Sequence, residues 1–474
     1  MTHPTNDIVF GTDGWRAIIA KDYTFDNLAR VAHATASWLL ATTGEGARIA
    51  LGHDTRFQGR LFSEHAASVF ASRGITVLFS DEIAATPAVS YITIEGACDA
   101  GIVITASHNP AAYNGFKIKG PYGGSALPEI ISQVEREIPG ADHKFPEPES
   151  FSEYVQRGLI QLRNFRTEYL EMLKGKLDLD AVRKAGLILA HDAMYGAGQG
   201  MFSELIGNDH VIEIRSEINP GFGGVAPEPI EKNLSELSAL VVEKDCSAGI
   251  ANDGDADRIG MFDEKGKFVD SHKLLALLVR YLHEDKGLTG DIVKTLSTTN
   301  MLDAMGLKYG LHVHTTPIGF KYIGGYMLEH DVIVGGEESG GMAVKGHVPE
   351  RDGIYIGMLI LEMMAYRGKF LSTLVEELEN DFGVFRYHRV DVHTDLASKN
   401  AALEKLRSSG GLSTIAGFTV NSVNTTDGYK HETDSGWVLI RASGTEPVLR
   451  IYAESTSKEI AVASVEDTIA QLGV

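Results

Sequence analysis

The chain repeats one pattern that limits its possible folds. Short apolar runs, at Arg48–Gly52, Ile75–Phe79 and Ile102–Ile104, alternate with the helical spacing of Phe62–Ser72 and Ala88–Glu95, and two of the runs stop at a polar corner. Alternation of strands and helices is typical of a doubly wound sheet. Ligands of such sheets lie outside the carboxyl ends of the strands, so we expect functional residues in these corners.

The corner after the third run is Thr105–Pro110. Pro110 cannot donate to a strand ladder and disfavours a helical Asn109, so the strand must end here. Ser107 is thereby placed at a strand end. The alternative interpretation is a turn whose polar side chains satisfy local backbone groups, and this segment alone leaves both interpretations open.

Two cationic residues stand in glycine-containing loops of the same region. Arg16 ends the segment Phe10–Arg16 and is either a phosphate ligand, whose planar fork matches phosphate oxygens, or a surface arginine. Lys117 lies within Tyr113–Lys119 and is either a proton-transfer or phosphate-neutralising group, or a solvated lysine at a strand edge.

Three aspartates, Asp253, Asp255 and Asp257, follow the apolar run Ala248–Ala251. Alternate positions of extended chain point the same way, so we expect the three carboxylates to share one space. They would repel one another there unless a hard cation lies between them. With Arg258 alongside, the segment predicts a Mg²⁺ site that bridges to a phosphate.

The competing interpretation of these aspartates is an EF-hand calcium loop. Counted from Asp253, the third, fifth and twelfth positions are acidic, the last being Glu264. The sixth position should be glycine but is Arg258, and the flanking segments look like strands rather than helices. The EF-hand interpretation fails on both counts.

Two further loops carry polar groups between glycines. Gly335–Gly341 offers acidic acceptors and a hydroxyl, which suits a polyhydroxylated ligand or, alternatively, an ordinary acidic turn. Arg441–Pro447 joins two predicted strands and combines an arginine, hydroxyls and the amides around a glycine, which favours a phosphate-binding nest. The segments around this second loop predict an α+β arrangement.

Composition excludes several classes of protein. The chain has 474 residues, too many for one core, and a net charge of −21, which argues against nucleic acid as a partner. Its two cysteines are too few for a disulfide framework, and no apolar run is long enough to span a membrane. We expect a cytoplasmic protein, with no membrane partner, and leave its oligomeric state open.

Four of these loops together resemble one family along the whole chain, the α-D-phosphohexomutases. Thr105–Pro110 is similar to the family's phosphoserine loop, Asp253–Arg258 to its metal loop, Gly336–Gly340 to its sugar loop and Arg441–Pro447 to its distal-phosphate loop. The resemblance implies three doubly wound mixed-sheet α/β domains plus a C-terminal α+β domain around a central cleft. The expected boundaries are 1–145, 146–262, 263–380 and 381–474.

The resemblance also implies the role of each matched residue. Ser107 would carry the phosphoryl group and also contact Mg²⁺, which Asp253, Asp255 and Asp257 hold. The remaining catalytic residues would be Arg16, His108, Lys117 and Arg258. The substrate-binding residues would be Lys321, Glu337, Ser339, His347, Arg441, Ser443, Gly444 and Thr445.

The implied reaction interconverts glucose 1-phosphate and glucose 6-phosphate, with a hexose 1,6-bisphosphate as intermediate and activator. The loops at Thr316–Tyr322 and Lys345–Gly353 look most like the phosphoglucomutase branch. Phosphomannomutase activity is the first alternative, and a phosphoglucosamine mutase or a metal-dependent phosphohydrolase is less favoured. The two phosphate loops argue against the hydrolase, which needs only one.

Overall fold

The strand that leads to Ser107 lies inside a sheet of order β1-β5-β4-β2-β3-β6, in a computed structural model that describes residues 8–442 and 447–474. Strands β2, β3, β4 and β6 run parallel, whereas β5 pairs antiparallel with both β4 and β1. The elements are β1 (Trp15–Ile18), α1 (Phe25–Thr42), β2 (Arg48–His53), α2 (Gly59–Ser72), β3 (Thr76–Ser80), α3 (Thr86–Glu95), β4 (Ala100–Ile104), β5 (Tyr113–Lys119), α4 (Pro128–Glu137), α5 (Phe151–Gln156) and β6 (Ile160–Arg163).

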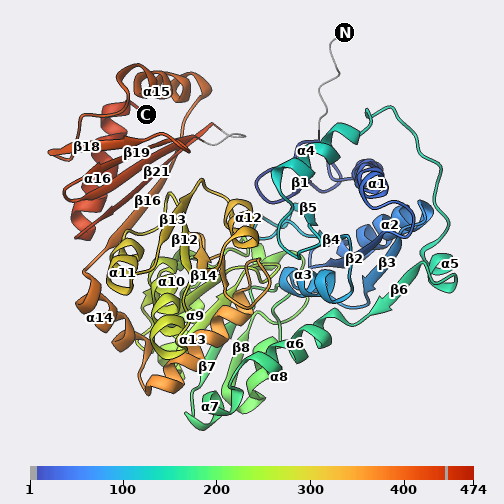
Figure 1. Ribbon diagram of the computed structural model, residues 1–474, viewed down its shortest axis with the longest axis horizontal. Helices are drawn as coiled ribbons and strands as arrows, with labels where there is room; N and C mark the ends of the chain where they lie inside the picture. Colours follow the sequence, from blue (N-terminus) through green and yellow to red (C-terminus); the bar gives the residue numbers. More distant parts are fainter. Residues whose placement is uncertain (1–7, 443–446) are drawn as a thin grey trace. The chain divides into compact units, whose positions relative to one another are not determined.

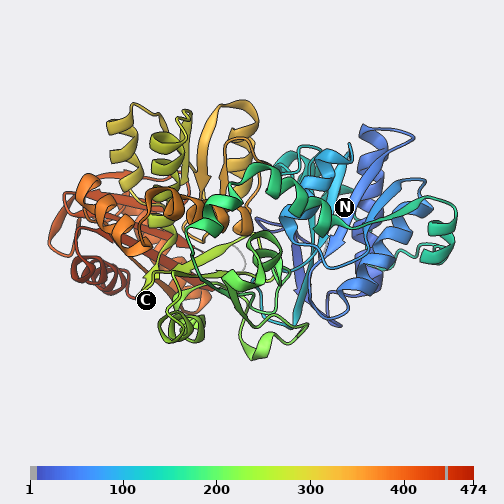
Figure 2. The ribbon, with the colours of Figure 1, turned by 90° about the horizontal axis from the view of Figure 1, so that it is seen from below.

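Different helices cover the two faces of this sheet. Large residues such as Leu51, Ile102 and Phe116 belong to a core cluster that also contains residues of α1 and α2. On the opposite face α3 packs against β2 and β4, where Gly52 and Gly101 leave no room for a Cβ. Figures 1 and 2 show helices on both sides of this sheet. Alternation along each strand thus buries both faces.

A second sheet has the order β11-β10-β9-β7-β8. The three aspartates directly follow its strand β9. Strands β7, β8 and β9 are parallel, and β10 returns antiparallel to β9. The elements are α6 (Phe165–Lys176), α7 (Leu179–Lys184), β7 (Leu189–Asp192), α8 (Met201–Ile206), η1 (Asn208–His210), β8 (Val211–Ile214), η2 (Phe222–Gly224), η3 (Glu231–Asn233), α9 (Ser235–Glu243), β9 (Ala248–Asn252), β10 (Ile259–Phe262) and β11 (Phe268–Val269).

The chain forms two compact units, the first made of residues up to Leu288 together with Gly319–Leu374, and the second of Thr289–Ile318 with Val375–Val474. Further elements of the first unit are α10 (Ser271–Arg280), the π-helix η4 (Tyr281–Asp285), α12 (Phe320–Glu329), β14 (Val332–Gly336), β15 (Met342–Val344) and α13 (Gly353–Arg367). Strands β14 and β15 are antiparallel. The predicted domain boundaries stay predictions.

The second unit contains a parallel strand pair and an antiparallel sheet. Strands β12 (Asp291–Thr295) and β13 (Val313–Thr316) are parallel and are joined by α11 (Met301–Tyr309). The antiparallel sheet has the order β16-β21-β20-β19-β18-β17, and α16 packs on β16 and β21. Its elements are β16 (Arg386–His393), α15 (Leu396–Ser409), β17 (Thr414–Ile415), β18 (Phe418–Asn424), β19 (Tyr429–Thr433), β20 (Gly436–Ala442), β21 (Val448–Ser455) and α16 (Lys458–Leu472). This confirms the predicted α+β region. Helix α14 (Leu371–Phe382) runs from one unit into the other.

Within the described residues, no helix combines the length and the apolar character that a membrane crossing requires.

The contact between α3 and β4 depends on a glycine. A Cβ added to Gly101 would lie 2.3 Å from Thr93 Oγ1 and 3.1 Å from Lys119 Cβ. We therefore expect Gly101→Ala to lower stability by about 1–3 kcal/mol, seen as a lower midpoint of thermal unfolding. Gly175→Ala in α6, where an added Cβ has open space, is the control and should not destabilise. An unchanged midpoint for Gly101→Ala would contradict this packing.

Candidate active site

Ser107 is fully buried at the end of β4, in a backbone conformation that is unusual for serine. Its φ is 52°, in the left-handed region. The Ser107 amide donates to Thr105 Oγ1 at 2.8 Å, and Thr105 Oγ1 donates to Asp54 Oδ2 at 2.5 Å. The Ser107 hydroxyl donates to Asp253 Oδ2 at 2.8 Å. The strand end predicted from sequence therefore delivers this hydroxyl to the aspartate cluster.

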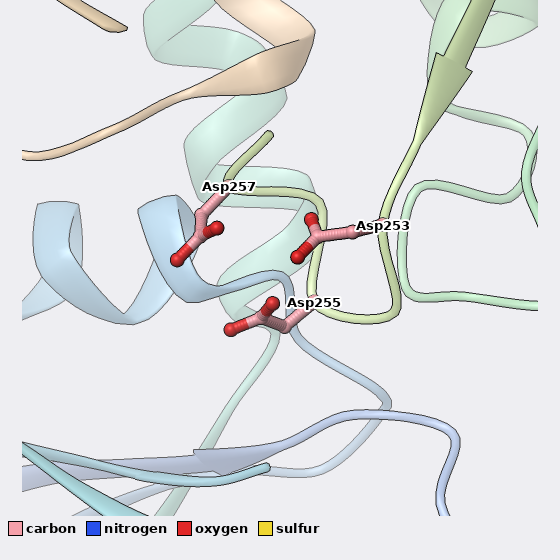
Figure 3. Close-up of side chains that lie close together, drawn as sticks. All are labelled: Asp253, Asp255 and Asp257. Carbon is pink, nitrogen blue, oxygen red and sulfur yellow. The ribbon is translucent and has the colours of Figure 1, made fainter. Parts of the chain in front are cut away.

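The aspartate cluster is formed by a tight turn between β9 and β10. Asp253, Asp255 and Asp257 are all buried, each with a carboxylate oxygen within 4.8 Å of the others, and Figure 3 shows the three carboxylates gathered around one space. The expectation of extended chain was wrong here, since Ala256 has a φ of 58° and its amide donates to Asp253 O. The strands on both sides confirm that this is no EF-hand.

Lys117 supplies the nearest positive charge to these aspartates. Its Nζ lies 2.7 Å from Asp255 Oδ2 and 2.9 Å from Asp257 Oδ2, and its side chain is fully buried. Burial would lower the pKa of Lys117, but Asp13 and Asp255 outweigh it and raise the pKa. Lys117 therefore stays protonated and neutralises charge, and it is not a solvated edge lysine.

Sequence reasoning missed two charged residues of this cluster, Asp13 and Arg351. Asp13 Oδ2 lies 2.8 Å from both Lys117 Nζ and Arg351 Nη2, and 3.2 Å from Arg16 Nη2. Arg351 Nη2 also lies 2.9 Å from Asp257 Oδ2. Burial would raise the pKa of Asp13, yet Arg351 and Lys117 hold it well below its usual value. In the sequence, Asp13 lies inside the segment Phe10–Arg16 and Arg351 inside the loop Lys345–Gly353, and this position was their only signal.

The other predicted catalytic residues lie around Ser107. His108 Nδ1 is 3.3 Å from Ser107 Oγ, and Arg16 Nη1 donates to Asn109 Oδ1 at 2.8 Å. Burial and the nearby Arg258 hold the pKa of His108 well below its usual value, so this ring is neutral at pH 7. The structure thus brings Arg16, His108 and Lys117 to the Ser107 corner.

The predicted sugar loop lies beside the metal loop. Arg258 and Gly341 form an antiparallel bridge, and the Ile259 amide donates to Gly340 O at 3.2 Å. Glu337 is buried, and burial raises its pKa to about 7, although Arg351 acts in the opposite direction. Ser339 lies on the partly exposed turn of the same loop. This loop is therefore positioned to meet a ligand that reaches Arg258.

Two predicted substrate ligands have other neighbours. Lys321 lies in the first turn of α12, its Nζ 5.4 Å from the centroid of the Tyr322 ring. His347 Nε2 lies 2.7 Å from Asp352 Oδ2, and its Nδ1 lies 3.3 Å from Lys176 Nζ. Asp352 also caps α13. The substrate roles of both residues stay predictions.

The last predicted loop belongs to the second unit. Arg441 is the residue before the last of β20, and its Nε donates to Asp427 Oδ1 at 2.9 Å. Ser443, Gly444 and Thr445 lie outside the described residues.

The aspartate cluster fits a hard divalent cation. Asp255 Oδ1 and Asp257 Oδ1 are buried and have no hydrogen-bond partner among the residues that the structure describes. Burial, together with repulsion from Asp257 and Asp255, raises the pKa of Asp253 well above its usual value. A Mg²⁺ ion would satisfy the unpartnered oxygens and relieve this repulsion, because carboxylate oxygens are its preferred ligands.

Comparison with known proteins identifies the class. Models of the four domains of the phosphoglucomutase/phosphomannomutase family match residues 7–144, 167–266, 270–382 and 390–472. The chain belongs to this family, and it is a phosphohexomutase, an isomerase. This confirms the resemblance and the fold class predicted from the sequence.

Individual relatives carry more than one name. A phosphoglucomutase/phosphomannomutase from Thermococcus kodakarensis is 32% identical over 95% of each chain. A phosphoglucosamine mutase from Oceanobacillus iheyensis is 30% identical, again over 95% of each chain. The crystal structure of a candidate phosphomannomutase from Thermus thermophilus covers 100% of both chains with a TM-score of 0.86 and 35% identity.

Asp255→Asn tests the metal site. The change removes one negative charge without altering size, so we expect Mg²⁺ affinity to fall by about tenfold or more, measured by titration calorimetry. Asp263→Asn is the control, because Asp263 is also buried but accepts from the Lys265 and Lys267 amides of the β10–β11 turn. Equal Mg²⁺ affinities for both variants would contradict the site.

Glu337 gives the protein a pH dependence of defined sign. A carboxyl whose pKa rises from 4.5 to about 7 binds a proton in the folded state that the unfolded state releases, so stability falls between these pH values. Glu337→Gln should therefore gain about 2–3 kcal/mol relative to the parent at pH 8, and nearly none at pH 4.5. Thermal midpoints at both pH values measure this. The exposed Glu329 provides the control for the same substitution, Glu329→Gln.

Proposed function

We propose that this phosphohexomutase interconverts α-D-glucose 1-phosphate and glucose 6-phosphate through a phosphorylated Ser107. The observation that carries the proposal is the Ser107 hydroxyl, 2.8 Å from Asp253 Oδ2, in a buried cluster of carboxylates and cations. Phosphoryl transfer depends on positioning and charge neutralisation, and this cluster offers both. A buried serine that served only a turn would need none of these charges.

The reaction has two half-steps that balance. The Ser107 phosphoryl group moves to the free hydroxyl of the hexose phosphate, the proton of that hydroxyl passes to the Ser107 oxygen, and a hexose 1,6-bisphosphate forms. After this intermediate reorients, the Ser107 oxygen takes the other phosphoryl group and a proton returns to the sugar oxygen. Neutral His108, 3.3 Å from Ser107 Oγ, is placed to hold the serine proton in this second transfer. Free bisphosphate would rephosphorylate Ser107, which makes it an activator.

The charged side chains stabilise the transferring group. Asp253, Asp255 and Asp257, together with the Ser107 oxygen, would hold Mg²⁺, which would supply Lewis-acid neutralisation of phosphoryl oxygens. Lys117 remains charged through its contacts with Asp13 and Asp255 and lies against the same carboxylates. We assign Lys117 to charge neutralisation rather than to proton transfer.

Further residues would bind the sugar and the phosphates of the substrate. Glu337 and Ser339 would bind sugar hydroxyls, and Arg16 and Arg258 would bind phosphate oxygens near Ser107. Lys321, His347, Arg441, Ser443, Gly444 and Thr445 complete the proposed ligands, the last four for the phosphate that is not transferred. Since the reoriented intermediate presents either end to the same loops, these residues must accept both orientations.

Glucose is our first choice of sugar, mannose the second and glucosamine the third. The Phe320–Lys321 segment and the Lys345–Gly353 loop favour glucose phosphates, because they look most like the phosphoglucomutase branch of the family. Mannose phosphates, which differ from glucose phosphates by the orientation of one hydroxyl, are the second candidate, and the 32% identity with the Thermococcus kodakarensis relative supports them. The 30% identity with a phosphoglucosamine mutase over nearly the full chain supports glucosamine phosphates as the third. We place the reaction in the cytoplasm, where hexose phosphates are metabolised.

Ser107→Ala tests the proposal directly. Without the hydroxyl there is no phosphoryl carrier, so we expect the mutase rate to fall by roughly a thousandfold or more. Intact mass after incubation with glucose 1,6-bisphosphate should show a phosphate adduct on the parent that the variant lacks. The exposed Ser72 at the end of α2 gives a control, Ser72→Ala, which should keep both.

The assays should use glucose, mannose and glucosamine phosphates in parallel and should measure released phosphate. The ratio of kcat/KM values ranks the sugars. A phosphate adduct on another residue, or parental activity in Ser107→Ala, would refute the role of Ser107. Phosphate release faster than isomer formation would favour a phosphohydrolase.

A further inference from the structure

One buried arginine in the first sheet domain binds the main chain around Ser107. Arg56 follows β2, and it is 3% exposed. Its Nη2 donates to Ser107 O and Asn109 O, both at 2.6 Å, and its Nη1 donates to Pro110 O and Tyr113 O, both at 3.0 Å. Four carbonyl oxygens of one loop therefore surround a single guanidinium group.

An aspartate on the same corner holds the other end of that loop. Asp54 Oδ2 lies 3.3 Å from Arg56 Nε, and neither side chain is exposed. The same carboxylate oxygen accepts from Thr105 Oγ1, and Thr105 Oγ1 accepts from the Ser107 amide. The amide of Ser107 is thus linked to Asp54 and its carbonyl to Arg56. This ion pair holds the serine backbone on both sides.

Residues next to the second sheet, which carries the aspartates, also contact Arg56 and the Ser107 carbonyl. The ring centroid of Phe222, in η2, lies 4.9 Å from Arg56 Cζ, and Phe222 is buried. A Cβ added at Gly254, within the aspartate turn, would lie 2.6 Å from Ser107 O. The carbonyl of Ser107 is therefore enclosed between Arg56 and the turn that carries the aspartates.

The contacts of Arg56 stabilise the strained backbone of Ser107. A serine at a φ of 52° is strained, and such a conformation persists only where the surrounding structure enforces it. The buried carbonyl of Ser107 also needs a donor, because an unmade buried hydrogen bond costs about 1–3 kcal/mol, and the part-buried carbonyls of Asn109, Pro110 and Tyr113 share the same guanidinium. The planar guanidinium has five donors in a fixed fork. The ammonium group of lysine has three and cannot reproduce this geometry.

We propose that Arg56 is a positioning residue for Ser107. It holds the loop 105–113 in the strained conformation that directs the Ser107 hydroxyl at Asp253, and it does so through main-chain carbonyls rather than through contact with substrate. The proposal rests on the proposed role of Ser107 as phosphoryl carrier.

The test compares Arg56→Lys with Arg30→Lys. Arg30 is an equally buried arginine of α1 that donates to Pro139 O from Nε and Nη2, at 3.0 and 2.7 Å, and so matches Arg56 in burial and in the type of acceptor. We expect Arg56→Lys to lower kcat by about 100-fold, as for the loss of charged hydrogen bonds in a positioned reaction. KM for the hexose phosphate should stay within about threefold, because Arg56 contacts none of the residues proposed to bind the sugar.

Hydrogen exchange gives a second readout that needs no catalysis. Peptides covering 104–114 should exchange about tenfold faster in Arg56→Lys, with the rest of the chain unchanged. Arg30→Lys should leave those peptides and kcat as in the parent. Should Arg56→Lys fail to fold, Arg56→Gln is measured in the same way, and guanidinium chloride at non-denaturing concentration should restore part of its kcat.

The outcomes separate this proposal from the proposed function. If the parent converts no hexose phosphate, the proposed function fails, and the exchange of 104–114 alone decides the role of Arg56. Faster exchange with a parental kcat overturns the positioning role, and so does parental exchange in both variants. A kcat loss that Arg30→Lys shares equally also overturns it, because general destabilisation would then explain the effect.

Discussion

The structure depends on the balance of charge around Asp255 and Asp257. Two buried cations, Lys117 and Arg351, lie within 2.9 Å of these carboxylates, and both also contact Asp13. Removing one member of such a cluster leaves an uncompensated buried charge, which costs far more than a surface ion pair contributes. The charges are therefore interdependent, and each loop that supplies one must hold its place.

Buried polar contacts hold the loops that carry these charges. The sheets bring the strand ends together, and polar side chains next to the charged cluster then fix the position of each loop. Arg56 and Asp54 hold the serine loop by its main chain, whereas Asn252 closes the aspartate turn by donating from Nδ2 to Arg258 O at 2.9 Å. Lys119 and Glu350 form a further buried pair beside Arg351. The catalytic hydroxyl and the carboxylates thus rest on loops that buried hydrogen bonds and ion pairs hold in place.

Much of the site could be predicted because its residues stand in recognisable local sequence patterns. Ser107 follows a β-branched run and precedes Pro110, and the aspartates alternate directly after another apolar run. Asp13 and Arg351 could not be found this way, since they are 338 positions apart and only their contact reveals their role. The aspartate turn was also misjudged as extended chain, because a φ of 58° at Ala256 leaves no sequence signature.

By itself the sequence determined the type of sheet, the strand ends, the acidic triad and the family, because hydrophobic periodicity and short motifs are local properties. Only the tertiary structure decided which charges meet. Lys117 contacts three carboxylates, and His347 contacts Asp352. Arg56 donates to four main-chain carbonyls. Such pairings join residues distant along the chain, and they follow from the packing of several elements at once rather than from any one segment's pattern.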